Sequence, residues 1–356
     1  MAGIDKVDVA LSLLKIAIVV GALLNVTPIM VWVERRGSAL IQDRPGPNRV
    51  GPFGLFQSLA DAAKFFFKED IIPLGSHKWL YTLAPMFGLI PALTTIAVIP
   101  WGRPFVFRGG RVFEPIVADV NVGILLIFAL ASMSVYGIVT AGWSSNNKYA
   151  LFGGIRSSAQ MISYELALTL SAISALMVAG SLRLTDVVWK QTGYFVLFDT
   201  IKIPAWNCFS PAMWLSMIVF SVAAFAETNR LPFDFAEAEA ELVAGYHTEY
   251  SSMKFALFFM SEYIAMATMS ALVVTLFFGG WDIPWYNEPA TFLGFLLSAI
   301  AFVVKVSVLL FIFVWIRWTI PRLKYDLLMK IGWKVFLPLA GVNILLVAWL
   351  IAERWI

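Results

Sequence analysis

Long apolar stretches, separated by shorter polar connections, dominate the pattern of residues along this 356-residue chain. Most of these stretches reach the length of about 20 residues that a helix needs to cross the hydrocarbon core of a bilayer. The pattern predicts eight membrane spans, at residues 10–33, 79–100, 120–141, 159–180, 212–228, 254–279, 292–315 and 334–352. We therefore expect an all-α polytopic membrane protein with a single membrane domain, residues 1–356.

Lysine and arginine are shared unequally between the connections. The odd-numbered connections carry 15 of them, whereas the even-numbered connections and the termini carry about eight. Short connections rich in these residues face the cytoplasm. The bias predicts that the connections 34–77, 142–158 and 228–253 are cytoplasmic and that both termini lie on the outer side.

The longest connection, residues 34–77, contains a segment with a helical period. Its apolar side is Phe56, Leu59, Ala60, Ala63, Phe66 and Phe67, and its polar side is Gln57, Asp61, Lys64 and Lys68. The segment is too short and too polar to span a bilayer, so we expect an amphipathic helix lying at the membrane surface. A cytoplasmic helix packed on protein is the alternative.

Composition agrees with the pattern and excludes several classes of site. The chain is 60% hydrophobic and 14% charged, with a mean hydropathy of +0.80, far from soluble globular composition. Its single cysteine, Cys208, and two remote histidines, His77 and His247, argue against a bound metal, haem or iron–sulfur cluster. We also expect no flavin and no nucleic-acid partner, so any electron carriers must belong to partner subunits.

Acidic residues gather in the segment AETNRLPFDFAEAEAELVAGYHTEY, which follows the fifth span. Its carboxylates are Glu227, Asp234, Glu237, Glu239, Glu241 and Glu249. Pro232 suits the start of a helix, and Asp234, Glu237 and Glu241 would then share one face. Two such charges about 6 Å apart repel by about 3 kcal/mol, so some of these acids should hold protons near neutral pH. A solvated acidic face is the alternative.

Ionisable residues also interrupt the predicted spans. They are Glu165, Glu227, Glu262 and Lys305. Each costs about 2.5–3.5 kcal/mol near the bilayer centre on insertion scales, so each should face the bundle interior, water or a partner charge. Together with the acidic segment they favour a proton relay. A structural ion pair between Glu262 and Lys305 is the alternative.

A basic stretch, WVERRGSALIQDRPGPNRVGPFG, follows the first span. Its charged residues are Glu34, Arg35, Arg36, Asp43, Arg44 and Arg49. Its prolines and glycines are too dense for helix or strand, so turns should shape it. Such a rigid cationic loop suits docking of a partner subunit or a polar head group, although plain lipid anchoring would also explain Arg35 and Arg36.

Two segments resemble a known family. ERRGSALIQDRPGPNRVGPFGLFQSLADAAKFFFKE and AETNRLPFDFAEAEAELVAGYHTEYSSMKFALFFMSEY are similar to the H subunit of the proton-pumping NADH:quinone oxidoreductase, respiratory complex I, called NADH dehydrogenase subunit 1 in mitochondria. The resemblance covers the whole chain. It implies that ubiquinone is a substrate bound in a chamber shared with hydrophilic subunits, one of which holds the terminal iron–sulfur cluster. Small membrane subunits and the lipid bilayer would be the other neighbours.

The resemblance also assigns roles. It implies a carboxylate path through Glu165, Glu227, Asp234, Glu237, Glu239, Glu241 and Glu262. It implies a quinone chamber and docking surface, which we take to include Glu34, Arg35, Arg36, Arg44, Arg49, Phe56, Asp61 and Arg230. Spans two to six would resemble half of an antiporter-like subunit, in a bacterial inner (plasma) membrane or, alternatively, a mitochondrial inner membrane.

Other functions remain open on the residues alone. One is the ion-translocating membrane subunit of a related hydrogenase-type complex, which works without a quinone. Another is a stand-alone cation/proton antiporter, which should be active when purified alone. A purely structural membrane anchor would tolerate neutral substitutions of the buried acids.

Overall fold

The computed structural model describes residues 6–107, 110–197, 201–234, 243–286 and 289–353. Within these ranges, seven helices are long and apolar enough to cross a membrane. They are α1 (Lys6–Ile41), α3 (Lys78–Thr95), α4 (Gly123–Ser144), α5 (Lys148–Ala179), α9 (Ser252–Phe277), α10 (Phe292–Thr319) and the continuous run of α11 (Tyr325–Ile331) and α12 (Leu337–Ala352). The predicted fold class, an all-α polytopic membrane protein, is confirmed.

The fifth predicted span corresponds to α7 (Pro211–Glu227), an apolar helix of 17 residues that is shorter than the other seven. The remaining helices are α2 (Gln57–Phe67) and α6 (Leu184–Gln191), with single turns at Pro52–Gly54, Ile96–Val98, Asn207–Phe209 and Gly245–His247. A π-helical turn, Gly332–Phe336, joins α11 to α12.

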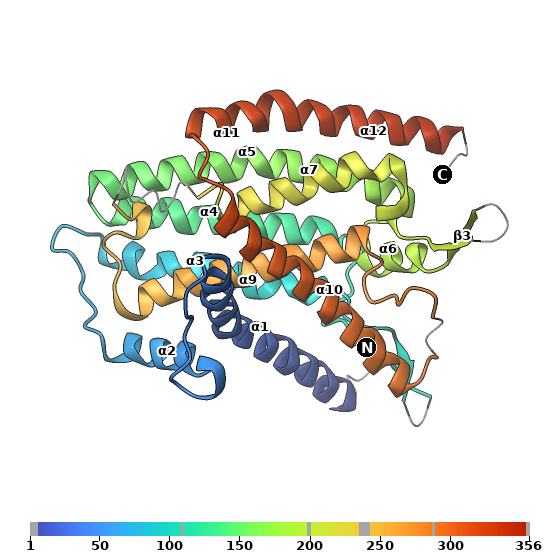
Figure 1. Ribbon diagram of the computed structural model, residues 1–356, viewed down its shortest axis with the longest axis horizontal. Helices are drawn as coiled ribbons and strands as arrows, with labels where there is room; N and C mark the ends of the chain where they lie inside the picture. The colour runs from blue at the N-terminus through green and yellow to red at the C-terminus, as the bar shows by residue number, and fades with distance from the viewer. Residues whose placement is uncertain (1–5, 108–109, 198–200, 235–242, 287–288, 354–356) are drawn as a thin grey trace.

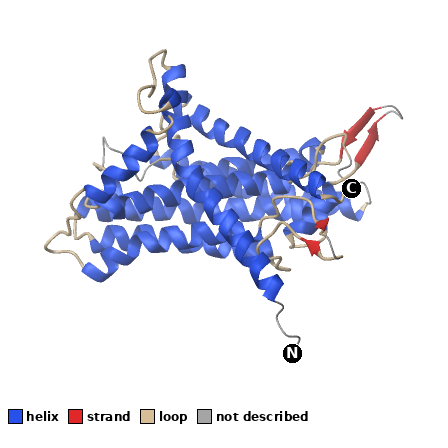
Figure 2. Ribbon diagram, turned by 90° about the horizontal axis from the view of Figure 1, so that it is seen from below, coloured by secondary structure: helices blue, strands red, loops and turns tan. Residues whose placement is uncertain are grey.

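Two antiparallel hairpins, which the sequence pattern did not predict, lie in the connections. Strand β1 (Phe105–Val106) pairs with β2 (Val112–Phe113), and β3 (Tyr194–Leu197) pairs with β4 (Ile201–Pro204). Both hairpins lie at the same end of the molecule as the end of α12 (Figure 2). The amphipathic helix α2 lies at the opposite end (Figure 1), so the two sets of connections are separated by the length of the bundle.

The long helices form a layered bundle (Figure 1). Helix α5 packs against α4, α7 and α12, while α3 packs against α4 and α9. Helices α1 and α10 cross α9 on the other side. Helix α9 is therefore the central helix, and its second half, from Ile264 to Phe277, is almost wholly buried.

Several helices extend beyond the predicted spans, and the run of α11 and α12 begins at Tyr325 instead of 334. Helix α1 continues to Ile41, because Glu34 and Ser38 are buried against protein rather than released into a loop. Helix α5 begins at Lys148 instead of 159, since Asn147 caps it by accepting a hydrogen bond from the backbone N–H of Tyr149 at 2.9 Å. Most of the predicted connection 142–158 is consequently helical.

Helix α5 buries its first half by means of small residues. Its buried face there includes Gly153, Gly154, Ser157 and Ser158, a composition that lets neighbouring backbones approach closely in membrane bundles. A Cβ added at Gly153 would lie 2.6 Å from the Cα of Gly245, in the turn that follows the acidic segment. The sequence of α5 therefore determines how closely that turn can pack.

Gly153→Ala is expected to cost at least about 1–3 kcal/mol, the usual range for overpacking a tight core, because the clash is with backbone that cannot rotate away. The thermal midpoint of the detergent-purified protein measures the effect. Gly341→Ala in α12 is the control, since a Cβ there meets nothing within 4 Å. Equal midpoints for the two variants would contradict the prediction.

Candidate functional site

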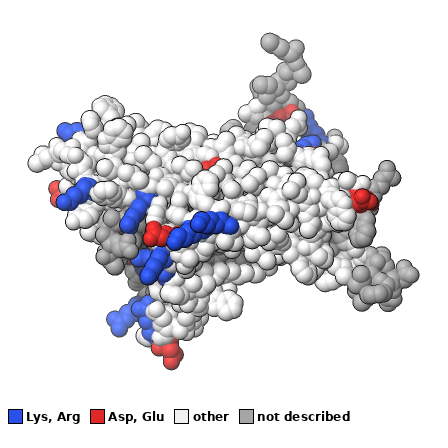
Figure 3. Space-filling view, turned by 90° about the horizontal axis from the view of Figure 1, so that it is seen from above, with Lys and Arg blue, Asp and Glu red and all other residues white. Residues whose placement is uncertain are grey.

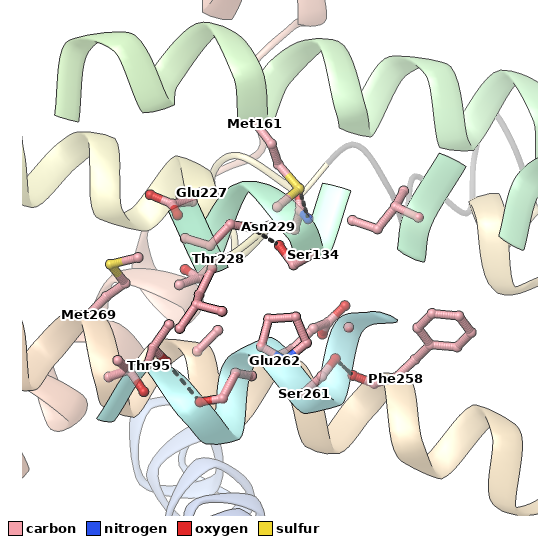
Figure 4. Close-up of a pocket in the computed structure, with 18 of the residues that line it drawn as sticks. Thr95, Ser134, Met161, Glu227, Thr228, Asn229, Phe258, Ser261, Glu262 and Met269 are labelled. Carbon is pink, nitrogen blue, oxygen red and sulfur yellow. Dashed lines mark hydrogen bonds between the residues drawn. The ribbon is translucent and has the colours of Figure 1, made fainter. Parts of the chain in front are cut away.

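A cavity whose lining is largely apolar, but which also presents two acids and several hydroxyls, lies where α3, α4, α5, α7 and α9 meet (Figure 4). Its volume of about 60 Å³ is enough for about four waters. Glu227 and Glu262 contribute its carboxylates. We call this space the acidic cavity.

The hydroxyl groups of the acidic cavity already donate hydrogen bonds to backbone carbonyls. Ser134 donates to the carbonyl of Ala131 at 2.6 Å, Ser261 to that of Phe258 at 2.7 Å, and Thr95 to that of Ala92 at 2.9 Å (Figure 4). The oxygen lone pairs are left as acceptors, so the lining favours ligands that donate hydrogen bonds, such as water. Together with the two carboxylates, this makes the cavity suited to a hydrated proton path.

Glu227 is the last residue of α7 and is 7% exposed. Its Oε2 has no hydrogen-bond partner among the described residues. The nearby carboxylate of Glu165, on α5, interacts with it electrostatically and itself accepts a hydrogen bond from Ser132 of α4. A buried carboxylate oxygen without a partner is costly unless it is protonated or hydrated, so Glu227 is poised to exchange a proton with water in the cavity.

The second carboxylate, Glu262, lies on α9 and accepts a hydrogen bond from the hydroxyl of Tyr246 at 3.1 Å. Tyr246 belongs to the turn Gly245–His247, which returns from the acidic segment and is almost fully buried. The cavity is therefore bounded on one side by the connection 228–253.

A buried ionic cluster joins α1 to α9 and α10. We call it the Glu34 cluster: Glu34, Arg230, Tyr263 and Arg317. One oxygen of Glu34 pairs with Arg317, while the other accepts from the hydroxyl of Tyr263 and lies 3.7 Å from Nη1 of Arg230. Glu34 is 7% exposed and Arg230 is 6% exposed, so these charges interact with little screening by water.

Arg230 connects the Glu34 cluster to the acidic cavity. Its guanidinium lies over the ring of Tyr263 at 4.1 Å and near that of Phe259 at 6.0 Å. It interacts electrostatically with both Glu34 and Glu262. Its Nε and Nη2 are buried and have no hydrogen-bond partner in the described part of the chain, so a ligand oxygen could reach them only after nearby side chains move.

The acidic segment is only partly described. Asp234 is buried and lies 3.5 Å from Nη2 of Arg322. Glu237, Glu239 and Glu241 lie outside the described residues. The expectation that a helix begins at Pro232 is wrong: residues 231 and 232 form a turn, and Phe233 and Asp234 are not helical. The amide of Gln160 holds this segment by donating to the carbonyls of Ala226 and Phe233 at 2.8 and 2.7 Å.

After α1 ends at Ile41, the rest of the basic stretch, residues 42–54, has the turn-rich form that its prolines and glycines predict. We call these residues the basic loop. Gly51 and Gly54 have positive φ angles of 73° and 74°, and at Gly51 the ring of Phe56 occupies the space of a Cβ. Arg36 donates to the carbonyl of Pro47 at 3.2 Å. Arg44 and Arg49 are exposed, as a surface available for docking requires.

The amphipathic helix α2 presents its apolar side outward. Leu59 is 56% exposed, Phe66 70% and Phe67 91%, so this side is not covered by the described part of the chain, and its placement at the membrane surface stays a prediction. The helix is attached to α9 at its end, where Ser252 donates to the carbonyl of Phe65 at 2.8 Å. On its polar side, Asp61 pairs with Arg35 of α1.

Asp61→Asn is expected to loosen α2 by severalfold in hydrogen exchange of residues 57–67, since a partly exposed pair contributes about 1 kcal/mol or less. Burial raises the pKa of Asp61, but the hydrogen bond and charge of Arg35, with Lys64, outweigh it and lower the pKa. The stabilisation of α2 by the Asp61–Arg35 pair is therefore fully present above about pH 4, the usual pKa of Asp. It is lost as the pH falls through the lowered pKa of Asp61. Lys68→Gln, which leaves the pair intact, is the control. Unchanged exchange in Asp61→Asn would contradict the prediction.

The ion pair considered between Glu262 and Lys305 does not form. The Lys305 ammonium group donates to the carbonyls of Phe278, Gly280 and Asp282 at 2.6–3.0 Å. Phe278 follows Glu262 by sixteen residues along α9, a distance of about 24 Å at 1.5 Å per residue. Lys305 instead caps the far end of α9, where a cation favours the negative end of the helix dipole.

Sequence reasoning missed several partners that the structure brings to the site. Arg317, Arg322, Tyr246, Tyr263 and Ser132 were not candidates. The arginines were counted only as evidence of orientation, and a tyrosine or serine within an apolar stretch carries no distinct signal. One signal was available in the sequence: the polar residues Glu262 and Tyr263 are adjacent in an apolar stretch. In the structure Glu262 lines the cavity and Tyr263 donates to Glu34.

Comparisons with known proteins agree on one family. Residues 14–348 match the NADH dehydrogenase family. The chain is 48% identical over 349 residues to an H subunit of the NADH-quinone oxidoreductase of Geobacter metallireducens, covering 98% of both chains. It is 47% identical to the H subunit of the same enzyme in Salinibacter ruber, covering 93% of both, and 45% identical to NADH-quinone oxidoreductase subunit 8 of Rhodothermus marinus, covering 93% of this chain and 94% of that one.

Proposed function

This chain belongs to the NADH dehydrogenase family, and we propose from this that it is the H subunit of an NADH-quinone oxidoreductase, respiratory complex I. The complex transfers electrons from NADH to a quinone, which is its substrate. The relatives in Geobacter, Salinibacter and Rhodothermus carry quinone oxidoreductase names, and no observation favours a hydrogenase-type subunit or a lone antiporter. The chain would function only with the other subunits of the complex.

The observation that carries the mechanism is the continuity between the Glu34 cluster and the acidic cavity. Arg230 interacts with Glu34 on one side and with Glu262 on the other. Beyond Glu262 lie the hydroxyls of the cavity and Glu227, and Glu165 follows. Ionisable and hydroxyl groups thus extend from the connection 228–253 into the interior of the bundle.

Reduction of a quinone to quinol consumes two protons and passes through anionic species. In a chamber of low dielectric constant, such a charge alters the protonation of nearby carboxylates. We expect the basic loop and Arg230 to face the quinone and to stabilise that charge. The protonation of Asp234 and of the adjacent Glu237, Glu239 and Glu241 would then respond, and Glu227 would pass the change into the membrane.

The remaining roles are proposals from the same resemblance. Arg35, Arg36, Arg44, Arg49, Phe56 and Asp61 would shape the quinone chamber or dock the hydrophilic subunits that hold the terminal iron–sulfur cluster. Small membrane subunits would contact the bundle. The membrane would be a bacterial inner membrane, with the α2 end of the molecule on the cytoplasmic side and both termini on the outer side.

A comparison of the isolated chain with the assembled complex tests the function. The complex purified through a tag on this chain should reduce a short-chain ubiquinone with NADH and acidify proteoliposomes. The chain purified alone should catalyse neither reaction and should exchange no cations for protons. Cation/proton exchange by the lone chain would overturn the proposal in favour of an antiporter, and a purified complex that cannot reduce quinone would overturn it outright.

A further inference from the structure

An apolar groove of about 360 Å³ opens on the outside of the bundle between α7, α9 and α10. Phe225 of α7 and Phe313 of α10 line it and stack with their ring centroids 3.7 Å apart. Among its described lining residues, Ser221 alone has a polar side chain. The groove therefore suits hydrocarbon, and none of the site residues described above lies in its lining.

One end of the groove is closed by protein and bordered by basic side chains. Pro232 and Ile320 line this end, and the backbone N–H of Leu323 donates to the carbonyl of Pro232 at 3.3 Å. The exposed residues Arg322 and Lys324 follow Ile320 by two and four positions. On the face seen from above, most of the visible Lys and Arg gather toward one end, and much of the remaining surface is uncharged (Figure 3).

We propose that this groove binds an acyl chain of an anionic phospholipid, whose phosphate is held by Arg322 and Lys324. Arg322 places one Nη 3.5 Å from Asp234 and keeps further donors of its guanidinium for a phosphate. Lys324, two residues further along the chain and also exposed, supplies a second positive charge. The positive-inside rule places these residues at the cytoplasmic leaflet, where anionic lipids provide the complementary charge.

The basic residues that follow the groove favour an acyl chain of an anionic lipid over a helix of a partner subunit. The groove follows α10 from Leu309 to Ile320, a length of about 16 Å. An anionic phospholipid places its acyl chain along this apolar length and its phosphate beside Arg322 and Lys324, whereas an apolar partner helix has no group to neutralise them. A single hydrocarbon chain is narrow enough to fill the space.

Selectivity for this lipid comes from its head group. Inside a bilayer an apolar groove gains little from hydrocarbon in particular, because lipid tails surround it everywhere. Each basic residue near the membrane surface strengthens binding of an anionic lipid by roughly fivefold. Removal of both Arg322 and Lys324 should therefore weaken the preference for an anionic head group by roughly 25-fold.

Photo-crosslinking of the purified complex in nanodiscs tests the proposal. The probes are phosphatidylglycerol and phosphatidylcholine, each with a diazirine in the middle of one acyl chain. Phosphatidylglycerol is expected to label peptides of α7 and α10 that line the groove, and phosphatidylcholine to label them at least tenfold less. The double variant Arg322→Gln, Lys324→Gln should remove this difference, whereas Lys190→Gln, at the opposite end of the molecule, should preserve it.

A second variant fills the groove without changing its charge. Ile312→Trp should abolish labelling of the groove by phosphatidylglycerol, whereas Val308→Trp, on the exposed face of α10 outside the lining, should leave it intact. Equal labelling by the two lipids in the wild type would overturn the proposal. So would crosslinking of a photoreactive residue at Ile316 to another polypeptide, which would identify the groove as a subunit interface.

Discussion

Glu227→Gln is expected to lower proton translocation by at least tenfold in a complex that assembles normally. Glutamine has nearly the same shape and can occupy the same buried position, but it cannot take up and release a proton. Because Oε2 of Glu227 has no partner in the described part of the chain, the substitution breaks no known hydrogen bond of that atom. The loss would therefore report proton transfer and not packing.

The measurement is made on membranes of wild type and variant after assembly has been confirmed. It compares the NADH-driven quinone reductase rate with the number of protons moved per electron. Loss of both, or of pumping alone, places Glu227 on the coupling path, and full activity of both would return it to a packing role. Glu249→Gln is the matched control, because Glu249 lies in the same connection but accepts a hydrogen bond from Asn147, at 2.6 Å, outside the acidic cavity.

Glu34→Gln is expected to destabilise the protein by about 3–5 kcal/mol, the usual cost of removing one partner from a buried ion pair. The neutral side chain would remove the carboxylate that both Arg230 and Arg317 contact. Since Glu34 also joins α1 to Tyr263 of α9, quinone reductase activity should fall with stability. Thermal unfolding of the purified complex and its quinone reductase rate measure the two effects.

The double variant Glu34→Gln, Arg317→Gln separates charge from packing. If uncompensated charge is the cause, removal of one arginine should restore part of the lost stability. Asp43→Asn is the control at an exposed acid of the neighbouring loop, where the positive φ of 49° suits asparagine. A double variant no more stable than Glu34→Gln would show that shape, and not charge balance, determines the cost.

The sequence alone determined the fold class and most of the long helices. Hydropathy is a local property, and a helix in lipid must satisfy its backbone hydrogen bonds within its own segment, so each span can be recognised without its neighbours. The same holds for the turn-rich basic loop and for α2, whose apolar period is visible over eleven residues. Helix ends were less certain, because the cap at Asn147 and the burial of Glu34 depend on side chains that hydropathy does not register.

The candidate site, too, could be predicted from the sequence only in part. That Glu165, Glu227 and Glu262 face the interior follows from the cost of exposing a charge to lipid. Which groups they meet does not follow, because the pairings join residues that are remote in the chain: Glu34 with Arg317, Asp234 with Arg322, and Gln160 with the turn at Phe233. Arginines at the ends of spans fit the positive-inside rule whether they bind lipid or protein. They therefore predict the orientation of the chain in the membrane, but not the residues with which they pair. Only the packing of α1, α9 and α10 decided that Arg317 neutralises a buried carboxylate, since the desolvation that makes this pairing necessary arises when the helices come together.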